Sequence, residues 1–301
     1  MTFPFHYDHA APLAFGGTLP EPKNFDESRV VILPVPVDRT TSYVPGTRNG
    51  PREILQASSH MELWDEEIGV DVHTVGLFTL PEMELPFGEL APLMNEIRRV
   101  ASEVLARDKF LVALGGEHSI TPPLVAAAAA RHSGLHVFQI DAHADLRDCY
   151  MGTPHNHACA MRRSLEYAPV TQVGIRSMST EEAEAAPHLS TRIFYDHSMR
   201  EDPNWIDRVV DSLGDPVYIT IDVDGMDPAI MPATGTPEPG GLSWYEMLAL
   251  LRAAITRRNV VACDVVELSP LPGLMAPNFL CAKLIYKMLA YKFGPDLKRG
   301  M

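Results

Sequence analysis

Short, strongly apolar runs alternate with longer segments of helical periodicity along most of this sequence, and this alternation restricts the fold more than any other feature. Each apolar run is too short for a buried helix and predicts a strand. The runs cover residues 30–35, 110–114, 135–140, 171–175, 192–195, 216–221 and 260–266, with a weaker one near Val72 that leads into a loop. Strands separated by helices imply a mostly parallel sheet with helices on both faces, which is the α/β class.

The segments between the strands carry the helical pattern. The predicted helices cover residues 51–58, 87–107, 157–165, 180–186, 204–213, 244–257 and 277–291, and a further Ala-rich helix ends at Arg131. Ser119 is the predicted N-cap of this Ala-rich helix, with two prolines in its first turn. Residues 1–28 lack periodicity and are predicted to form an irregular N-terminal arm over the surface. Residues 29–301 are predicted to form a single domain, which would carry any catalytic site.

Three metal-competent side chains follow the strand 135–140 directly. Asp141, His143 and Asp145 are spaced at i, i+2 and i+4, so they point to the same side if the chain stays extended. Carboxylate oxygens with an imidazole nitrogen suit a hard or borderline divalent ion such as Mn²⁺. The alternative interpretation is a solvated acidic turn after a strand.

Further polar residues follow three other predicted strands. His118 comes after the strand 110–114, Asp222 and Asp224 after 216–221, and Glu267 after 260–266. Taken singly, His118 can be a satisfied turn histidine and the two aspartates an Asx turn. The carboxyl ends of parallel strands lie along one edge of the sheet, where ligands bind, so we expect all four groups to converge there. Four carboxylates and two imidazoles exceed the needs of one ion and suit two divalent ions.

The composition limits the classes of partner. The formal net charge is -14, which disfavours nucleic acid and anionic membrane surfaces and is compatible with a cationic substrate. None of the four cysteines forms a Cys-x-x-Cys pair, so we expect free thiols in a reducing compartment. No signal peptide and no apolar stretch of membrane-spanning length is visible. We therefore expect a soluble, cytoplasmic protein.

Together the motifs resemble those of the ureohydrolases, the family of arginase, agmatinase, guanidinobutyrase and formiminoglutamase. The resemblance lies in Gly-Gly-Glu-His at 115–118, Asp-Ala-His-Ala-Asp at 141–145 and Ile-Asp-Val-Asp-Gly-Met-Asp-Pro at 221–228, with support from the loops 45–51 and 232–241. It implies a three-layer α/β/α fold of the arginase type, two Mn²⁺ ions per subunit, and hydrolysis of a guanidinium group to urea and an amine. It also implies homotrimers or homohexamers.

The resemblance assigns roles to individual residues. One manganese would be held by His118, Asp141, Asp145 and Asp222, and the other by Asp141, His143, Asp222 and Asp224. Asp141 and Asp222 would bridge the ions, and Asp145 also counts among the catalytic residues. Glu267 would pair with the substrate guanidinium, and His157 would shuttle protons. His155 is close enough in sequence to compete for that role or to contact the substrate.

The substrate is less well defined by the sequence. Arginases carry a polar loop with a Ser-Gly-Asn run after the Asp-x-His-x-Asp motif, and residues 146–156 lack it. The sequence is instead similar to agmatinases, so agmatine is the expected substrate. Arg147 can bind the carboxylate of a guanidino acid such as 4-guanidinobutyrate or 3-guanidinopropionate, or it can pair with Asp148 or another carboxylate.

Two other classes fit the residues less well. A deacetylase of related fold would use one zinc ion and about three protein ligands, and should lack His118 or Asp145. A regulatory homologue without activity should have lost at least one ligand, whereas all six are present.

Overall fold

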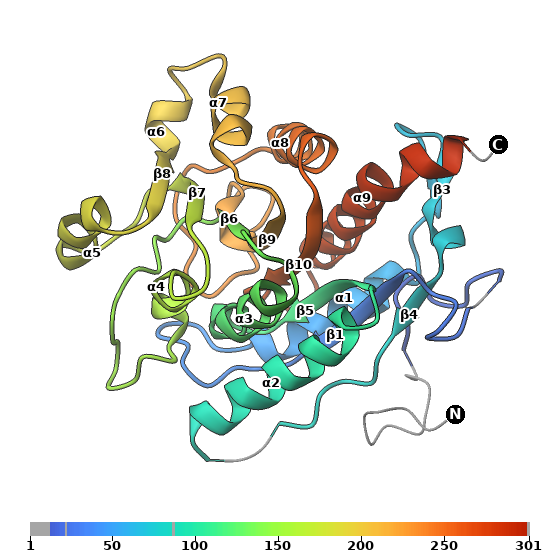
Figure 1. Cartoon of the computed structure of the whole chain (residues 1–301), viewed down its shortest axis with the longest axis horizontal. Coiled ribbons are helices and arrows are strands. Elements are labelled where there is room, and N and C mark those ends of the chain that lie inside the picture. The colour runs from blue at the N-terminus through green and yellow to red at the C-terminus, as the bar shows by residue number, and fades with distance from the viewer. Residues whose placement is uncertain (1–12, 22, 86–87, 300–301) are drawn as a thin grey trace.

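The computed structural model describes residues 13–21, 23–85 and 88–299. Its centre is an eight-stranded sheet in the order β4-β1-β5-β10-β9-β6-β7-β8, with every neighbouring pair parallel (Figure 1). The strands are β1 (Val30–Val35), β4 (Leu77–Thr79), β5 (Phe110–Gly115), β6 (His136–Ile140), β7 (Val170–Ile175), β8 (Thr191–Tyr195), β9 (Val217–Asp222) and β10 (Val260–Val266). Two short strands, β2 (Trp64–Asp65) and β3 (Val70–Asp71), form a separate antiparallel pair.

Helices cover both faces of this sheet. They are α1 (Gly50–Ser58), α2 (Leu90–Leu105), α3 (Thr121–Arg131), α4 (Ala160–Ser164), α5 (Thr180–Ala185), α6 (Asp196–Met199), α7 (Trp205–Ser212), α8 (Trp244–Arg257) and α9 (Ala276–Arg299). Helix α3 packs against α2 and α4, whereas α9 packs against α1 and α8. Within the described ranges, none of these helices combines the length and the apolar character that crossing a membrane requires.

The alternation of side chains along β1 explains the three layers. Val30 and Ile32 belong to a core that includes residues of α1, α7, α8 and α9. Val31 and Leu33 belong to a second core with residues of α2, α3 and α4. Successive side chains of a strand point to opposite faces, so a central strand with helices on both sides must be apolar throughout. The predicted α/β/α architecture with a mostly parallel sheet is confirmed.

The loop predicted after Val72 is wrong, because it contains the edge strand β4. Val72 begins the 3-10 helix Val72–Val75, and Gly76 then adopts a φ of 86°. This left-handed conformation favours glycine. It redirects the chain so that Leu77 pairs with Val30 at the edge of the sheet. A strand of three residues is too short to show the alternation by which strands are predicted.

Two helix ends also differ from the prediction. Ser119 does not cap α3, because it lies inside the 3-10 helix His118–Ile120 and its hydroxyl donates to Oε1 of Glu117 at 2.6 Å. Helix α9 continues to Arg299 instead of ending at residue 291, with Pro295 inside it. Phe293 in this extra segment is buried and packs edge-on against Phe110, which explains why the helix continues.

The predicted N-terminal arm lies partly outside the described residues, which omit 1–12 and 22. The described part, 13–21 and 23–28, contains turns and bends but no helix or strand. It is tied to the core: Phe15 is buried and its N–H donates to Oγ1 of Thr79 at 2.9 Å, while the Gly16 N–H donates to Oγ of Ser58 at 2.9 Å.

The four cysteines are free thiols, as expected. Cys159, Cys263 and Cys281 are buried and Cys149 is exposed. Burial raises the pKa of Cys159 to about 11, so its thiol stays protonated near neutral pH. The buried cysteines therefore act as small apolar side chains.

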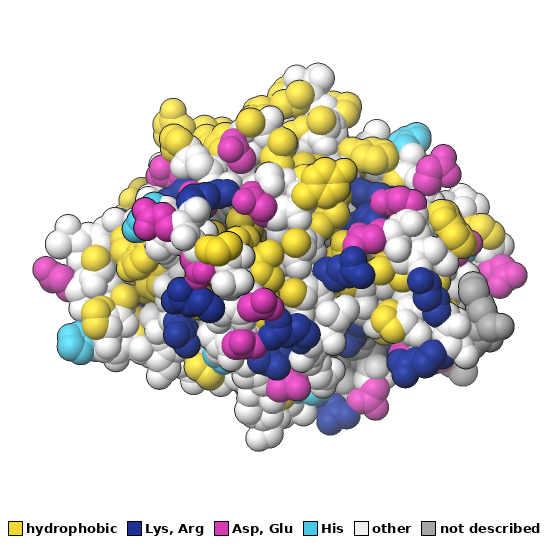
Figure 2. All heavy atoms as spheres, turned by 90° about the horizontal axis from the view of Figure 1, so that it is seen from above, with side chains coloured by type: hydrophobic (Ala, Val, Ile, Leu, Met, Phe, Trp, Pro, Cys, Tyr) yellow, Lys and Arg dark blue, Asp and Glu magenta, His cyan; other side chains and the backbone are white. Residues whose placement is uncertain are grey.

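Acidic and basic side chains are interspersed on the face that includes α7 and α8 (Figure 2). Many form ion pairs: Arg257 with Asp207 and Asp211, and Arg208 with Asp202. These pairs are exposed, so each contributes only about 0–1 kcal/mol to stability. The arginines of α7 and α8 named here are thus engaged in local pairs.

The carboxyl edge of the sheet gathers the residues that the sequence singled out. His118 follows β5, Asp141 follows β6, Asp222 ends β9 and Glu267 follows β10. Strands β10 and β9 lie between β5 and β6 in the sheet, so all four strands are central neighbours. Parallel strands place their carboxyl ends on one side, which brings together residues that are distant in sequence.

Candidate active site

Three carboxylates surround one histidine at this edge. Nδ1 of His118 lies 3.1 Å from Oδ2 of Asp141, 3.0 Å from Oδ2 of Asp145 and 3.5 Å from Oδ2 of Asp222. His118 is 1% exposed and Asp141 is fully buried. Charged groups this deeply buried require partners of opposite charge.

A second group shares one member with the first. Nδ1 of His143 lies 2.9 Å from Oδ2 of Asp224 and 3.7 Å from Oδ1 of Asp141. Ligand-type atoms of His118, Asp141 and Asp145 lie within 4.8 Å of one another, and so do those of Asp141, His143 and Asp224. The six predicted residues therefore converge, with Asp141 common to both groups.

Asp145 reaches the cluster by a different route from the one predicted. Strand β6 ends at Ile140, and Asp145 has a φ of 53°, in the left-handed region. The extended alternation through residues 141–145 is therefore wrong. Local hydrogen bonds replace it: Oδ1 of Asp141 accepts from the His143 N–H at 2.6 Å, and Oδ1 of Asp224 accepts from the Ala142 N–H at 3.0 Å. Aspartate tolerates a left-handed φ better than most residues do.

The orientation of His118 suits a metal ligand. Its Nε2 lies 2.9 Å from Oγ1 of Thr220, whose hydroxyl donates to Oδ1 of Asp264 at 2.6 Å. Because the threonine proton is used for Asp264, Nε2–H must donate, and Nδ1 presents its lone pair to the carboxylates. Nδ1 is buried and makes no hydrogen bond of its own. A ring nitrogen that faces three carboxylate oxygens needs a proton or a metal cation between them, and an outer hydrogen bond of this kind orients metal-binding histidines.

The electrostatics of the cluster also require cations. Burial and the charge of Asp141 raise the pKa of Asp145 to about 7, and burial and the charge of Asp224 raise the pKa of Asp222 well above its ordinary value. Burial lowers the pKa of His143, but Asp224 and Asp141 together outweigh this effect and raise that pKa to about 12. Metal ions compete with these protons for the same atoms. Two divalent cations would balance the four aspartate charges, so the residues present fit a dinuclear site.

Glu267 lies beside the cluster in a strained conformation. Its φ is 66°, and Oε1 accepts from the His118 N–H at 2.7 Å. A non-glycine residue in this region costs on the order of 1–3 kcal/mol. Burial and the neighbouring Glu117 carboxylate raise the pKa of Glu267 well above its ordinary value. A cation bound next to Glu267 would favour its charged form.

A pocket of about 240 Å³ opens over these residues. His143, Asp145, Asp222 and Glu267 line it, together with His157. Of the two histidines considered as proton shuttle, His157 lines this pocket. His155 lines a different hollow, which α2 and α3 border. Burial lowers the pKa of His157, and the charge of Glu117 offsets only part of this effect.

Arg147 also lines this pocket. Of the pairings considered for Arg147, the one with Asp148 is wrong, because Asp148 pairs with Arg162 and Arg163. The one with another carboxylate is met by Glu182. The Arg147 guanidinium instead stacks 4.6 Å from the centre of the Tyr150 ring, with Nε 3.9 Å from Oε2 of Glu182. Arg147 therefore presents a cation to the site.

The residues behind the cluster are harder to recognise from the sequence. Thr220 and Asp264 are predicted only as strand positions, although both are polar residues inside buried, apolar strands. A polar residue among apolar neighbours in a strand is the signal by which both could be recognised. Asp264 also accepts from the Tyr218 hydroxyl at 2.7 Å and the Thr121 hydroxyl at 3.0 Å, so its burial is satisfied.

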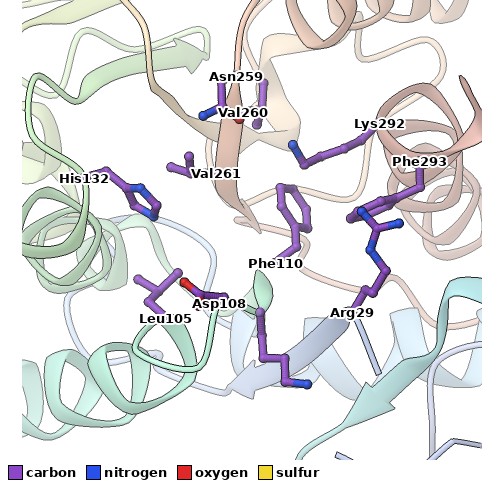
Figure 3. Close-up of a pocket in the computed structure, with 11 residues that line it drawn as sticks. Arg29, Leu105, Asp108, Phe110, His132, Asn259, Val260, Val261, Lys292 and Phe293 are labelled. Atoms are coloured by element: carbon purple, nitrogen blue, oxygen red, sulfur yellow. The ribbon is translucent and has the colours of Figure 1, made fainter. Parts of the chain in front are cut away.

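A second hollow of about 240 Å³ lies at the opposite edge of the sheet, around the first residues of β5 and β10 (Figure 3). Arg29, Phe110, Lys292 and Phe293 line it. Its cations have other contacts: Arg29 pairs with Asp296, and Lys292 lies over the rings of Phe110 and Phe293. None of the six predicted ligands borders it. Both metal-competent groups found among the described residues lie at the carboxyl edge.

Comparison with known proteins leads to the same family as the motifs. Residues 28–290 match the arginase family. The chain is 39% identical over 276 residues to N(1)-aminopropylagmatine ureohydrolase of Synechocystis sp., covering 89% of this chain and 90% of that protein. It is 36% identical over 251 residues to agmatinase of Bacillus cereus, covering 82% and 86%. The solved agmatine ureohydrolase of Thermoplasma volcanium has a TM-score of 0.84 at 32% identity, covering 92% and 94%. This chain therefore belongs to the arginase family.

Proposed function

We propose that this arginase-family hydrolase uses two manganese ions to convert agmatine, or its aminopropyl derivative, to urea and an amine. The observation that carries the proposal is the convergence of His118, His143 and four aspartates on one edge of the sheet, with Asp141 common to both groups. The substrate class is supported by the relatives named agmatinase and aminopropylagmatine ureohydrolase.

The six side chains would divide between two ions. His118, Asp141, Asp145 and Asp222 would hold one ion, and Asp141, His143, Asp222 and Asp224 the other. Bound divalent ions lower the pKa of water and so supply a nucleophile near neutral pH. Guanidinium is a weak electrophile because its charge is delocalised, so the site needs such a nucleophile.

The remaining residues orient the substrate and move protons. Glu267 would hold the guanidinium, since its buried carboxylate gains a partner of opposite charge. Fixing the cation in one orientation makes the attack effectively unimolecular. His157, on the wall of the same pocket, would give a proton to the departing amine.

His157→Ala is expected to lower kcat by about 10²–10⁴-fold, the usual contribution of a general acid, while leaving the bound metal unchanged. Urea release and elemental analysis of the purified protein measure the two quantities. His155→Ala is the matched control, because this side chain borders a different hollow. A loss in His155→Ala with none in His157→Ala would reverse the assignment.

The proposal leaves open which charged group the substrate carries at the end opposite its guanidinium. Arg147 favours a second candidate, a guanidino acid, because a carboxylate at the far end would pair with its guanidinium. An ammonium group there would be repelled instead. We expect Mn²⁺-loaded protein to release urea from agmatine or N1-aminopropylagmatine faster than from 4-guanidinobutyrate, 3-guanidinopropionate or L-arginine.

Arg147→Met distinguishes the two candidates. With a cationic substrate, kcat/KM should change by less than about threefold or rise, since an unfavourable charge is removed. With a guanidino acid, it should fall by about a hundredfold, as expected for the loss of a charge-assisted pair worth about 1.5–3 kcal/mol. Urea from none of the five compounds would contradict the proposed substrate class.

Assembly into homotrimers or homohexamers and a cytoplasmic location remain predictions from the resemblance and the sequence. The mass of the Mn²⁺-loaded protein in solution measures the first, and a monomer would contradict it. The identity of the metal is likewise proposed, and the metal content of protein purified without added ions would test it.

A further inference from the structure

One hydroxyl group joins the proposed proton donor to a buried carboxylate. Oγ1 of Thr40 donates to Oε1 of Glu117 at 2.9 Å and lies 3.2 Å from Nδ1 of His157. It also accepts from the His157 backbone N–H at 3.0 Å. Thr40 and Glu117 are fully or nearly buried, so water does not replace these contacts.

The Glu117 carboxylate can only accept in this arrangement. Its oxygens receive the backbone N–H groups of Arg39 at 2.8 Å and Thr40 at 2.7 Å, and the hydroxyls of Ser119 at 2.6 Å and Thr40. Four donors are thus directed at the two oxygens of one carboxylate. The single hydroxyl proton of Thr40 is therefore committed to Glu117.

This arrangement decides which ring nitrogen of His157 carries a proton. Because the hydroxyl proton of Thr40 points to Glu117, its oxygen can only accept from Nδ1, so Nδ1 must be the N–H donor. Nε2 then holds the lone pair in the neutral ring. It lies 3.5 Å from Oγ of Ser42, which borders the pocket over the cluster.

We propose that Thr40, anchored by Glu117, is a positioning residue that fixes the tautomer and orientation of His157, so that protons are taken up and released only at Nε2. This inference rests on the proposed role of His157. When His157 is protonated, Nε2–H is the bond that breaks and an N–H bond forms on the leaving amine, while Nδ1–H stays bonded to Thr40. The negative charge of Glu117, which accepts the hydrogen bond of the Thr40 hydroxyl, also stabilises the protonated ring of His157.

The backbone around Thr40 supports a fixed position. The Glu117 N–H donates to the Val37 carbonyl at 2.8 Å, and a Cβ on Gly116 would lie 1.8 Å from that same oxygen. The backbone at Val37 and the backbone at Gly116 are therefore in direct contact, with no room for a side chain between them. The contact between Thr40 and Glu117, 77 residues apart in sequence, is set by this packing.

Thr40→Val removes the hydroxyl at nearly constant volume, and Thr40→Ser restores it. In the Mn²⁺-loaded enzyme we expect Thr40→Val to lower kcat by about 10- to 100-fold, the usual effect of losing a partner that orients a functional histidine. KM and metal content should stay within about twofold of the unmodified enzyme. Thr40→Ser should recover kcat to within about threefold. Thr41→Val is the matched control, because the Thr41 hydroxyl bonds Asp38 instead.

The double variant separates positioning from a general loss of structure. If Thr40 acts through His157, adding Thr40→Val to His157→Ala should cause no further loss of kcat. A full additional loss there, or a Thr40→Ser enzyme as slow as Thr40→Val, would overturn the inference. A normal rate in His157→Ala would instead refute the proposed role of His157. A slow His157→Ala with a normal Thr40→Val would refute this inference alone.

Discussion

Asp141→Ala is expected to release the bound metal from both positions and to lower urea production to background, a loss of more than about a thousandfold. Asp141 is the residue common to both groups of ligand-type atoms in the described chain. Its loss therefore weakens both positions at once. Asp145→Ala, which touches only one group, should retain more metal. Elemental analysis and urea release at saturating substrate measure the two effects.

The Asp141 side chain also accepts two buried hydrogen bonds, from Nε2 of Gln139 and the N–H of His143, both at 2.6 Å. Leaving each donor unpaired costs about 1–3 kcal/mol, so the alanine variant needs a folding control. Asp141→Asn keeps one acceptor oxygen and should fold while still losing most activity. Asp148→Ala changes an exposed aspartate of the same segment and should behave normally. Full metal content and turnover in folded Asp141→Ala would refute the dinuclear proposal.

Glu267→Gln is expected to lower kcat/KM by about 30-fold or more. The substitution removes the charge that would hold the guanidinium, and truncating one partner of a buried charge pair typically costs about 2–5 kcal/mol. It keeps the shape of the side chain and the oxygen that accepts from the His118 N–H. Glutamine also occupies the left-handed conformation at a similar cost, so the free energy of unfolding should change little.

The measurement is urea release against substrate concentration, with metal content as a check that the cluster is intact. Glu184→Gln, an exposed residue of α5, makes the same chemical change outside the site and should leave kcat/KM unaltered. A Glu267→Gln enzyme within about threefold of normal would show that the guanidinium is held elsewhere.

The sequence predicted the sheet well because five of its strands, β1, β5, β7, β9 and β10, are buried along their whole length. The predicted bounds 30–35 and 260–266 coincide with β1 and β10, which are apolar enough to be recognised without their neighbours. The convergence of His118, Asp141, Asp222 and Glu267 then followed from strand direction alone. Strand β4 was missed because pairing with β1, and not its own three residues, makes it a strand.

The finer geometry depended on contacts between distant segments and was beyond a reading of local pattern. Asp148 is adjacent to Arg147 in the sequence, yet it pairs with Arg163 in α4. The choice between His155 and His157 likewise depends on which one lies near Thr40, more than a hundred residues earlier. Spacing along the chain carries no information about such contacts until the packing of the loops is known.

The order of strands has a consequence for biosynthesis. Strands β5 and β6 are made early, but β9 and β10, which lie between them in the sheet, are made late. The facing edge of β6 has no partner until β9 is complete at Asp222, and that of β5 has none until β10 is complete at Val266, roughly ten seconds after Asp141 at usual rates of translation. Unpaired edges of this kind join readily with other chains. The nascent chain is therefore most prone to misassociation during this interval, and the cluster at the carboxyl edge is complete only when translation is nearly finished.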